Sequence, residues 1–208
     1  MKRFIIFGAA VVFFGVVLTL SPSFVQAEEP KQAVETYIQN IQAVPFPITD
    51  QAAHDQMVAS ANAALDLPAL SKKALAENWD SAKPEDQKAF LDLMWKLVEY
   101  VAYPKSRRFM GKHKIDYPEV TPDSSGTAVH SVIHLEEKSL DAQVVYHLHD
   151  EAGVLKIDDI LLDDVSITED LKYQFDKIIQ QSGFPGLLVK MQERLDRAKK
   201  DTSVPAAA

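Results

Sequence analysis

Residues 127–162, TAVHSVIHLEEKSLDAQVVYHLHDEAGVLKIDDILL, contain three runs in which apolar and polar residues alternate. The alternation predicts strands over 127–135, 141–149 and 154–162, with turn-forming residues between them. A further strand is expected just before them, over 114–120. Together these runs predict an antiparallel four-stranded meander with one apolar face and one polar face.

The pairing of the strands can also be predicted from the apolar positions. Pairing Leu135 with Leu140 puts the apolar residues of both strands on one face, because a shift by one residue would turn one set over. The same rule applied to the next turn pairs Leu148 with Leu155. It also places Asp159 on the apolar face, where a carboxylate either serves as a general base or caps a helix or bulge.

Helical patterns precede and follow the meander. Apolar residues recur every three or four positions, and Pro, Asp and Ser stand where helices begin. We expect one α+β domain in which the helices pack on one face of the antiparallel four-stranded meander. The predicted helices cover residues 30–44, 50–64, 66–75, 84–103, 166–183 and the segment that begins at 185.

The helix over 84–103 is mostly apolar. Its charged residues after Phe90 are Asp92, Lys96 and Glu99, which fall on one narrow stripe, and Pro104 is expected to end the helix. So wide an apolar surface is typical either of a helix packed on two sides or of a helix that faces an apolar cavity. Taken alone, this helix favours the two-sided core.

The composition excludes several classes of protein. The chain of 208 residues carries a net charge of −8, which argues against nucleic acid as a partner because phosphate binding needs clustered positive charge. It contains no cysteine, which excludes disulfides, thiolate metal sites and lipid attachment at a cysteine. Its 7 glycines form no nucleotide-binding loop.

The N-terminal residues have the pattern of a signal peptide. Lys2 and Arg3 precede an apolar run over 4–20, and Val25-Gln26-Ala27 fits the rule for signal peptidase cleavage. Such a chain would be exported; an uncleaved membrane anchor is the alternative. The expected organisation is a signal peptide at 1–27, one folded domain at 28–198 and a flexible tail at 199–208.

Catalytic and metal-binding patterns are sparse. No Gly-x-Ser-x-Gly, His-Glu-x-x-His or Gly-x-Gly-x-x-Gly motif occurs. Four histidines, His130, His134, His147 and His149, are expected on the polar face of the sheet. There a solvated surface is favoured over a zinc or pH-sensing cluster. We therefore predict no catalytic residue, no metal and no cofactor.

One basic segment interrupts this acidic chain. Lys105, Arg107 and Arg108, followed by Lys112 and Lys114, come directly after the apolar helix with no acidic residue among them. The segment is either a solvated turn or a basic surface for a phosphate-bearing ligand or an acidic partner.

Three ordered sets of residues resemble one known family. They are Asp66-Leu67, Ala74-Leu75, Trp79, Pro84-Glu85-Asp86-Gln87 and Phe90; then Lys156-Ile157-Asp158-Asp159-Ile160, Val165-Ser166-Ile167 and Gln174-Phe175; and last Ile178-Ile179, Gly183 and Leu187-Leu188. The family is MlaC, the periplasmic toluene-tolerance auxiliary proteins of a lipid ABC transporter. The resemblance spans about residues 32–195.

The resemblance implies a phospholipid carrier rather than an enzyme and, with the signal peptide, a location in the periplasm of a Gram-negative cell. Such proteins shuttle phospholipid between the substrate-binding subunit of an inner-membrane ABC transporter and an outer-membrane lipoprotein complex, which maintains outer-membrane lipid asymmetry. It further implies transient contacts with both membrane complexes, a monomer, and a lipid-binding role for the domain at 28–198. Phospholipid versus hopanoid-like cargo and the direction of transport stay open.

The chain departs from the family pattern at a few positions. Ala76 and Asp164 stand where the family often has glycine, which puts the local turn geometry in question. Leu171-Lys172 stand where the family often has Tyr-Arg, which leaves open the partner contacts of that helix.

With the resemblance added, an apolar cavity is expected between the 84–103 helix and the sheet. A two-tailed lipid has about 30 methylenes that each cost ~0.8 kcal/mol in water, so we expect a cavity at or above the upper end of the usual ~300–1,000 Å³. Lys105, Arg107 and Arg108 are assigned to the headgroup or to a partner. The predicted lipid-contacting residues are Phe90, Leu93, Met94, Leu97, Val98, Val101, Val129, Ile133, Val144, Tyr146, Leu148, Ile157, Phe175 and Leu188.

Two other functions fit the same patterns. One is a cup-shaped isomerase-like enzyme that uses Asp159 on a small apolar substrate. The other is a periplasmic interaction or chaperone module whose apolar helix is a docking surface.

Overall fold

The structure is a computed structural model that describes residues 29–203 except 112, 125 and 136–139. The predicted signal peptide at 1–27 lies outside the described residues. Within the described part of the chain, no helix is long and apolar enough to cross a membrane.

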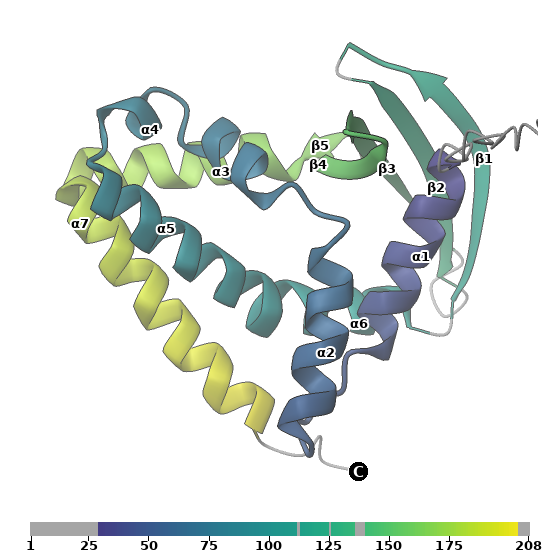
Figure 1. Cartoon of the computed structure of the whole chain (residues 1–208), viewed down its shortest axis with the longest axis horizontal. Helices are drawn as coiled ribbons and strands as arrows, with labels where there is room; N and C mark the ends of the chain where they lie inside the picture. The colour runs from purple at the N-terminus through teal and green to yellow at the C-terminus, as the bar shows by residue number, and fades with distance from the viewer. Residues whose placement is uncertain (1–28, 112, 125, 136–139, 204–208) are drawn as a thin grey trace, which may run out of the picture.

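Helices precede and follow a run of strands, in the predicted order (Figure 1). The α+β class is therefore confirmed. The first helices are α1 (Pro30–Ala43), α2 (Gln51–Asn62), α3 (Leu67–Leu75), α4 (Glu77–Ser81), α5 (Pro84–Leu97), the π-helix η1 (Val98–Ala102) and α6 (Tyr103–Met110). The strands are β1 (Lys114–Pro122), β2 (Thr127–Leu135), β3 (Leu140–Glu151), β4 (Val154–Leu162) and β5 (Val165–Ser166), and α7 (Ile167–Ser203) follows them.

The sheet has five antiparallel strands in the order β1-β2-β3-β4-β5, so the predicted count of four is wrong. The additional strand is β5, in which Val165 pairs with Leu162 and Ser166 pairs with Leu161. A strand of two residues is too short to show an alternating pattern. It also runs directly into α7, so its residues look like the start of the helix.

The predicted register is confirmed at one turn and wrong at the next. Leu135 lies opposite Leu140, as the apolar pattern requires. Leu148, however, lies opposite Ile157 and not opposite Leu155. The register shifts again directly before Leu148, where the pairing of β3 with β4 has a bulge.

The turn between β3 and β4 explains the difference. Glu151 pairs with Val154, so the connection is only two residues long. Both of them have positive φ, 55° at Ala152 and 87° at Gly153. Two-residue hairpin turns of this kind match the twist of the strands. The turn therefore fixes which residues of β3 and β4 pair, although the apolar pattern predicted another register.

The first hydrophobic core lies between the sheet and α1. Val34, Tyr37 and Ile38 of α1 pack among the buried residues of the sheet, of which Val129 and Tyr146 are examples. Figure 1 shows α1 lying against the sheet, with α2 and α6 beside it. The prediction that helices cover one face of the sheet therefore holds for α1.

The second core is formed by helices alone. Leu67 and Leu75 of α3, Phe90 of α5 and Phe175 and Leu187 of α7 belong to it. The rings of Phe90 and Phe175 meet edge to face, with 5.4 Å between their centroids. Figure 1 shows α5 and the two arms of α7 extending away from the sheet. These helices do not cover the sheet, which differs from the predicted arrangement.

The apolar helix does not end at Pro104. It passes through η1 into α6, and the Tyr103 N–H donates to the Val98 carbonyl, five residues back. This wider turn leaves Pro104 in the first turn of α6, where the missing N–H of proline costs nothing. Glu99, which belongs to the narrow stripe of charged residues, is only 4% exposed.

The last helix begins and bends where the sequence predicts. The Glu169 N–H donates to the Ser166 Oγ at 3.1 Å, which is the predicted cap. Gly183 has φ 69° and ψ 176°, so α7 is kinked there, and Pro185 begins its second arm. This arm runs to Ser203 and thus includes the first part of the predicted tail; the remainder lies outside the described residues.

Both positions where the family often has glycine carry strained backbone. Ala76 has φ 46° and ψ −123°, and Asp164 has φ 66°. L-residues other than glycine adopt such angles only at a cost, which is smaller for Asp than for Ala.

We expect Ala76→Gly to stabilise the protein. Removing the Cβ relieves strain of ~1–3 kcal/mol, and the greater freedom of glycine in the unfolded chain offsets part of it, so the free energy of unfolding should rise by about 1 kcal/mol. Urea denaturation followed by circular dichroism measures it. Ala59→Gly, at an exposed position inside α2, is the control and should lower stability by about 1 kcal/mol. A loss of stability in Ala76→Gly would contradict the strain argument.

Candidate functional site

A pocket of about 650 Å³ lies where the two cores meet. It is partly open, and most of the residues around it are apolar. Its volume is within the usual range for small-molecule sites but below the upper end that we expected. The lining residues are Tyr37, Leu65, Leu67, Leu70, Met94, Leu97, Val98, Val101, Ala102, Tyr103, Lys105, Ser106, Phe109, Ile160, Leu162, Ile167, Leu171, Gln174, Phe175, Ile178, Leu187, Lys190, Met191 and Arg194.

The pocket is bounded by helices more than by the sheet. Met94, Leu97, Val98 and Val101 line it from α5 and η1, and Phe175 lines it from α7. These five are among the predicted lipid-contacting residues. Leu93 and Leu188 pack against the helical core instead, and Phe90 is part of it.

The sheet residues predicted for the cavity lie elsewhere. They belong to the first core, beside α1 and outside the pocket lining: Val129, Ile133, Val144, Tyr146, Leu148 and Ile157. The reason is that α1, and not the 84–103 helix, covers this part of the sheet. Tyr37 of α1 meets Tyr146 edge to face at 6.4 Å, and its burial there raises the pKa of Tyr37 well above 10.0.

Three cations border the pocket. Lys105 was predicted from the sequence, whereas Lys190 and Arg194 of α7 were not. The sequence feature that could have identified them is their spacing of four residues, which places both on one side of the helix. Leu187 and Met191 of the same helix also line the pocket. Among the described residues, Lys190 forms an ion pair with Glu193 at 3.1 Å, and no ion pair is formed by Lys105 or Arg194.

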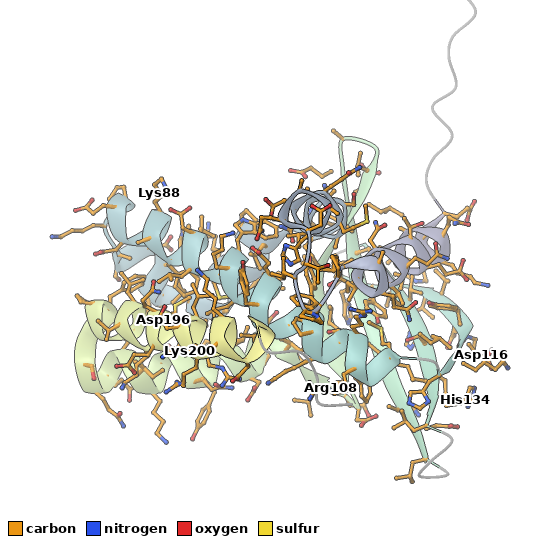
Figure 2. All side chains as sticks on the ribbon, turned by 90° about the horizontal axis from the view of Figure 1, so that it is seen from below. Lys88, Arg108, Asp116, His134, Asp196 and Lys200 are labelled. Atoms are coloured by element: carbon orange, nitrogen blue, oxygen red, sulfur yellow. The ribbon has the colours of Figure 1, made fainter. Side chains whose placement is uncertain are left out.

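The two predicted arginines do not reach the pocket lining. Arg107 donates to the backbone carbonyl of Val44 at 3.0 Å, which ties α6 to the end of α1. Arg108 is exposed on α6 (Figure 2). Their assignment to a headgroup or a partner therefore stays a prediction.

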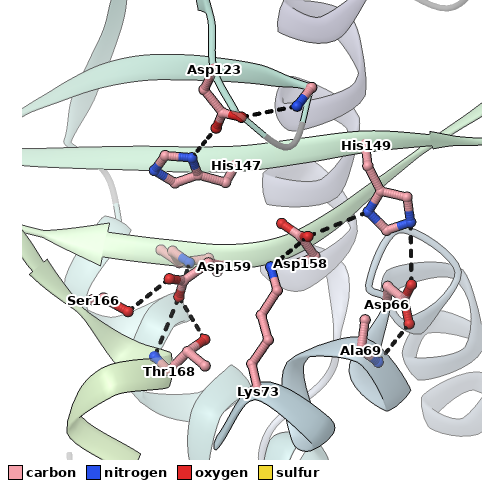
Figure 3. A network of polar contacts seen from close by, with 12 residues as sticks. Asp66, Ala69, Lys73, Asp123, His147, His149, Asp158, Asp159, Ser166 and Thr168 are labelled. Atoms are coloured by element: carbon pink, nitrogen blue, oxygen red, sulfur yellow. Dashed lines mark hydrogen bonds and ion pairs between the residues drawn. The ribbon is translucent and has the colours of Figure 1, made fainter.

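Asp159 holds the junction between β4 and α7. It lies opposite His147 at the bulge, so the prediction that it faces the apolar side beside Val144 is wrong. Figure 3 shows its carboxylate accepting hydrogen bonds from the hydroxyls of Ser166 and Thr168, each at 2.7 Å. It also accepts from the backbone N–H of Thr168 at 3.3 Å and of Ile160 at 2.8 Å. These contacts make it a helix cap, which is the structural one of the two predicted roles.

A family model described as MlaC protein matches residues 31–193. The chain belongs to the MlaC family. Among solved structures, a phospholipid-binding protein from Ralstonia solanacearum in complex with a phospholipid matches with a TM-score of 0.66. It is 20% identical, and the match covers 81% of this chain and 95% of that one. At this identity the similarity shows the fold. A comparison with curated proteins found no match.

The histidines of this MlaC-family chain do not share one site. His147 contacts Asp123, and His149 lies 3.2 Å from Asp66 (Figure 3). The third, His130, shares a hydrogen bond with Thr121 at 3.1 Å. His134 lies between Asp116 and Asp141, near the end of the sheet that is away from α5 and α7 (Figure 2). Each ring therefore has its own partners.

The stability of the protein should depend on pH through His134. Hydrogen bonds with Asp116, and then with Asp141, raise the pKa of His134 above 6.5. Its contribution is therefore fully present below about pH 6.5 and is lost as the pH rises through the higher folded value. We expect His134→Gln to destabilise the protein at about pH 5 and to be nearly neutral at about pH 9. NMR titration of the ring tests the pKa directly, and an equal effect at both pH values would contradict this account.

Proposed function

We propose that this chain is a periplasmic phospholipid carrier that holds acyl chains in the pocket between its two cores. The observation that carries the proposal is the pocket itself, which is largely apolar, partly open and bordered by cations. The family of the chain supports the same function. The Ralstonia protein of the same fold was solved with a phospholipid, which supports the same class of ligand here.

The physical need for such a carrier is large. About 30 methylenes at ~0.8 kcal/mol each keep a two-tailed lipid out of water, so a carrier must bury the tails nearly as well as a bilayer does. A pocket of about 650 Å³ that is partly open leaves part of the lipid outside the lining. We propose that the headgroup lies at the opening, beside the cations that border the pocket.

The pocket contacts divide by chemistry. We assign the acyl chains to the apolar wall that includes Leu97 and Val101, where packing makes no directional demand and chains of different length fit. Met94 suits the same role because its side chain repacks easily. The lipid phosphate is assigned to Lys105 and Arg194.

The carrier would move between two membranes. The family resemblance implies delivery between the substrate-binding subunit of an inner-membrane ABC transporter and an outer-membrane lipoprotein complex. Export by the predicted signal peptide at 1–27 would place the chain between them. A monomer without catalytic activity suffices for this role.

Lipid analysis tests the carrier function. Protein purified from a Gram-negative host should release phospholipid, at about one molecule per chain, in denaturing mass spectrometry. After delipidation it should take up labelled phospholipid from vesicles. Lipid-free protein from several hosts, together with no uptake, would overturn the proposal.

The phosphate assignment gives a separate prediction. Arg194→Glu should weaken phospholipid uptake roughly tenfold or more, because a hydrogen bond to a charged group contributes roughly 1.5–3 kcal/mol. Arg197→Glu is the matched control, since it makes the same charge change at an exposed position of the same helix outside the pocket lining. Equal uptake by both variants would show that the phosphate lies elsewhere.

A further inference from the structure

A second polar site lies where α2 meets the π-helix. His54 of α2 is fully buried, at 0% exposure, and neither of its ring nitrogens has a hydrogen-bond partner among the described residues. Leaving buried polar atoms unpaired costs roughly 1–3 kcal/mol. Such a side chain therefore points to a ligand that it could bind.

Two carboxylates face the same ring nitrogen. The His54 Nδ1 lies 3.5 Å from the Asp55 Oδ1 and 3.8 Å from the Glu99 Oε1. The three atoms all lie within 4.8 Å of one another. A tetrahedral zinc ion with bonds of ~2.0–2.2 Å separates its ligand atoms by roughly 3.3–3.6 Å. The three side chains would therefore need to move only slightly toward one another to bind such an ion.

We propose that His54, Asp55 and Glu99 form a binding site for a zinc-like divalent cation. Imidazole nitrogen and carboxylate oxygen are both ligand types that zinc accepts, and with three protein ligands a water molecule would complete a tetrahedral coordination. The ion would link α2 to η1, the helix that also supplies Val98 and Val101 to the pocket. The site itself is separate from the pocket and does not depend on the carrier function.

The surroundings allow an ion to enter. The Asp55 side chain is 64% exposed, so the site opens to solvent on that side, whereas the Glu99 side chain is only 5% exposed. Asp55 also accepts a hydrogen bond from Gln51 at 2.7 Å, through the oxygen that faces His54. When a metal ion binds, the Gln51 amide would release this oxygen or donate to the other carboxylate oxygen of Asp55.

One lysine competes with the metal. Lys96 Nζ lies 2.8 Å from the Glu99 Oε2, the oxygen that does not face His54. Its side chain is 53% exposed and can move into solvent. Because its positive charge opposes that of the ion, removing it should strengthen metal binding. Stronger metal binding without Lys96 would not be expected if His54 had a purely structural role.

The chain contains a natural control. His134 also lies between two carboxylates, at 2.8 Å from Asp141 and 3.0 Å from Asp116. It contacts them through opposite ring nitrogens, so a single ion cannot bind the imidazole and both acids together. His134→Gln should therefore leave metal binding unchanged.

Zinc titration tests the proposal on the purified protein, free of any histidine tag. Competition with a chromophoric chelator should show one Zn²⁺ per chain, and ZnCl₂ but not MgCl₂ should raise the Tm, reversibly with EDTA. His54→Gln and the exposed Asp55→Asn should each weaken Zn²⁺ binding about tenfold or more, and Lys96→Gln should strengthen it.

The absence of stoichiometric Zn²⁺ binding would overturn the proposed site. Wild-type affinity in both His54→Gln and Asp55→Asn, or a loss of affinity in His134→Gln, would do the same. If His54→Gln does not fold, Asp55→Asn and Lys96→Gln decide.

Discussion

Val101→Asp should strip the purified protein of phospholipid while the protein stays folded. Val101 lies in η1 and lines the pocket, and its side chain is only partly buried by the protein itself. Without lipid, an Asp side chain there can stay hydrated at the open pocket. With an acyl chain beside it, the carboxylate loses its water with no partner, which costs several kcal/mol. The lipid content should therefore fall at least about tenfold.

The matched control for this experiment is Val189→Asp. Val189 lies on α7, is 56% exposed and does not line the pocket, so the same change meets water there. Both variants are compared by the ratio of phospholipid to protein in denaturing mass spectrometry and by circular dichroism. A full lipid load in Val101→Asp would place the acyl chains outside this pocket, even if the carrier function itself holds.

Among the substitutions proposed for this protein, Asp159→Ala should lower the free energy of unfolding most, by about 3 kcal/mol. The substitution removes the acceptor for two hydroxyls and two backbone N–H groups, and it leaves the hydroxyl of buried Thr168 without its partner. Asp159→Asn keeps one acceptor oxygen and should cost less than Asp159→Ala. The measurement is the free energy of unfolding in urea.

Two comparisons make this result specific. Asp92→Ala removes a carboxylate that is 64% exposed and, within the described residues, forms an ion pair with Lys88 alone, so its effect should stay below about 0.5 kcal/mol. The ratio of phospholipid to folded protein should be unchanged in Asp159→Ala, because Asp159 does not line the pocket. A stable Asp159→Asn variant that had lost an activity on a small substrate would instead favour the enzymatic alternative.

The order of the elements could be predicted because each was marked locally. The alternation of apolar and polar residues over 127–135 and 154–162 predicted the bounds of two strands as they are observed. Pro30 and Pro84 correctly marked the first residues of two helices. The pairing at Leu135 followed because one face of each strand is apolar. The backbone of Ala152 was not predictable in this way, because alanine does not favour positive φ and only the folded hairpin requires it.

The pocket was harder to predict because it depends on which helix covers the sheet. The apolar surface of the 84–103 helix indicated either a second packing partner or a cavity, and both are present. Phe90 packs against α7, whereas Leu97 and Val101 face the pocket. The tyrosine pair Tyr37 and Tyr146, which packs α1 against the sheet, joins segments far apart in the chain. No local pattern marks such a contact.

The division into two cores affects how the protein can accommodate ligands of different size. Trp95 and Val98 pack against both cores, and the pocket takes its lining from both. A change in the volume of the pocket would therefore act first on the contacts that join the two cores, of which the ion pair between Lys73 of α3 and Asp158 of β4, at 2.6 Å, is one. Under the proposed carrier function, acyl chains of different length would be accommodated at this boundary and not inside either core.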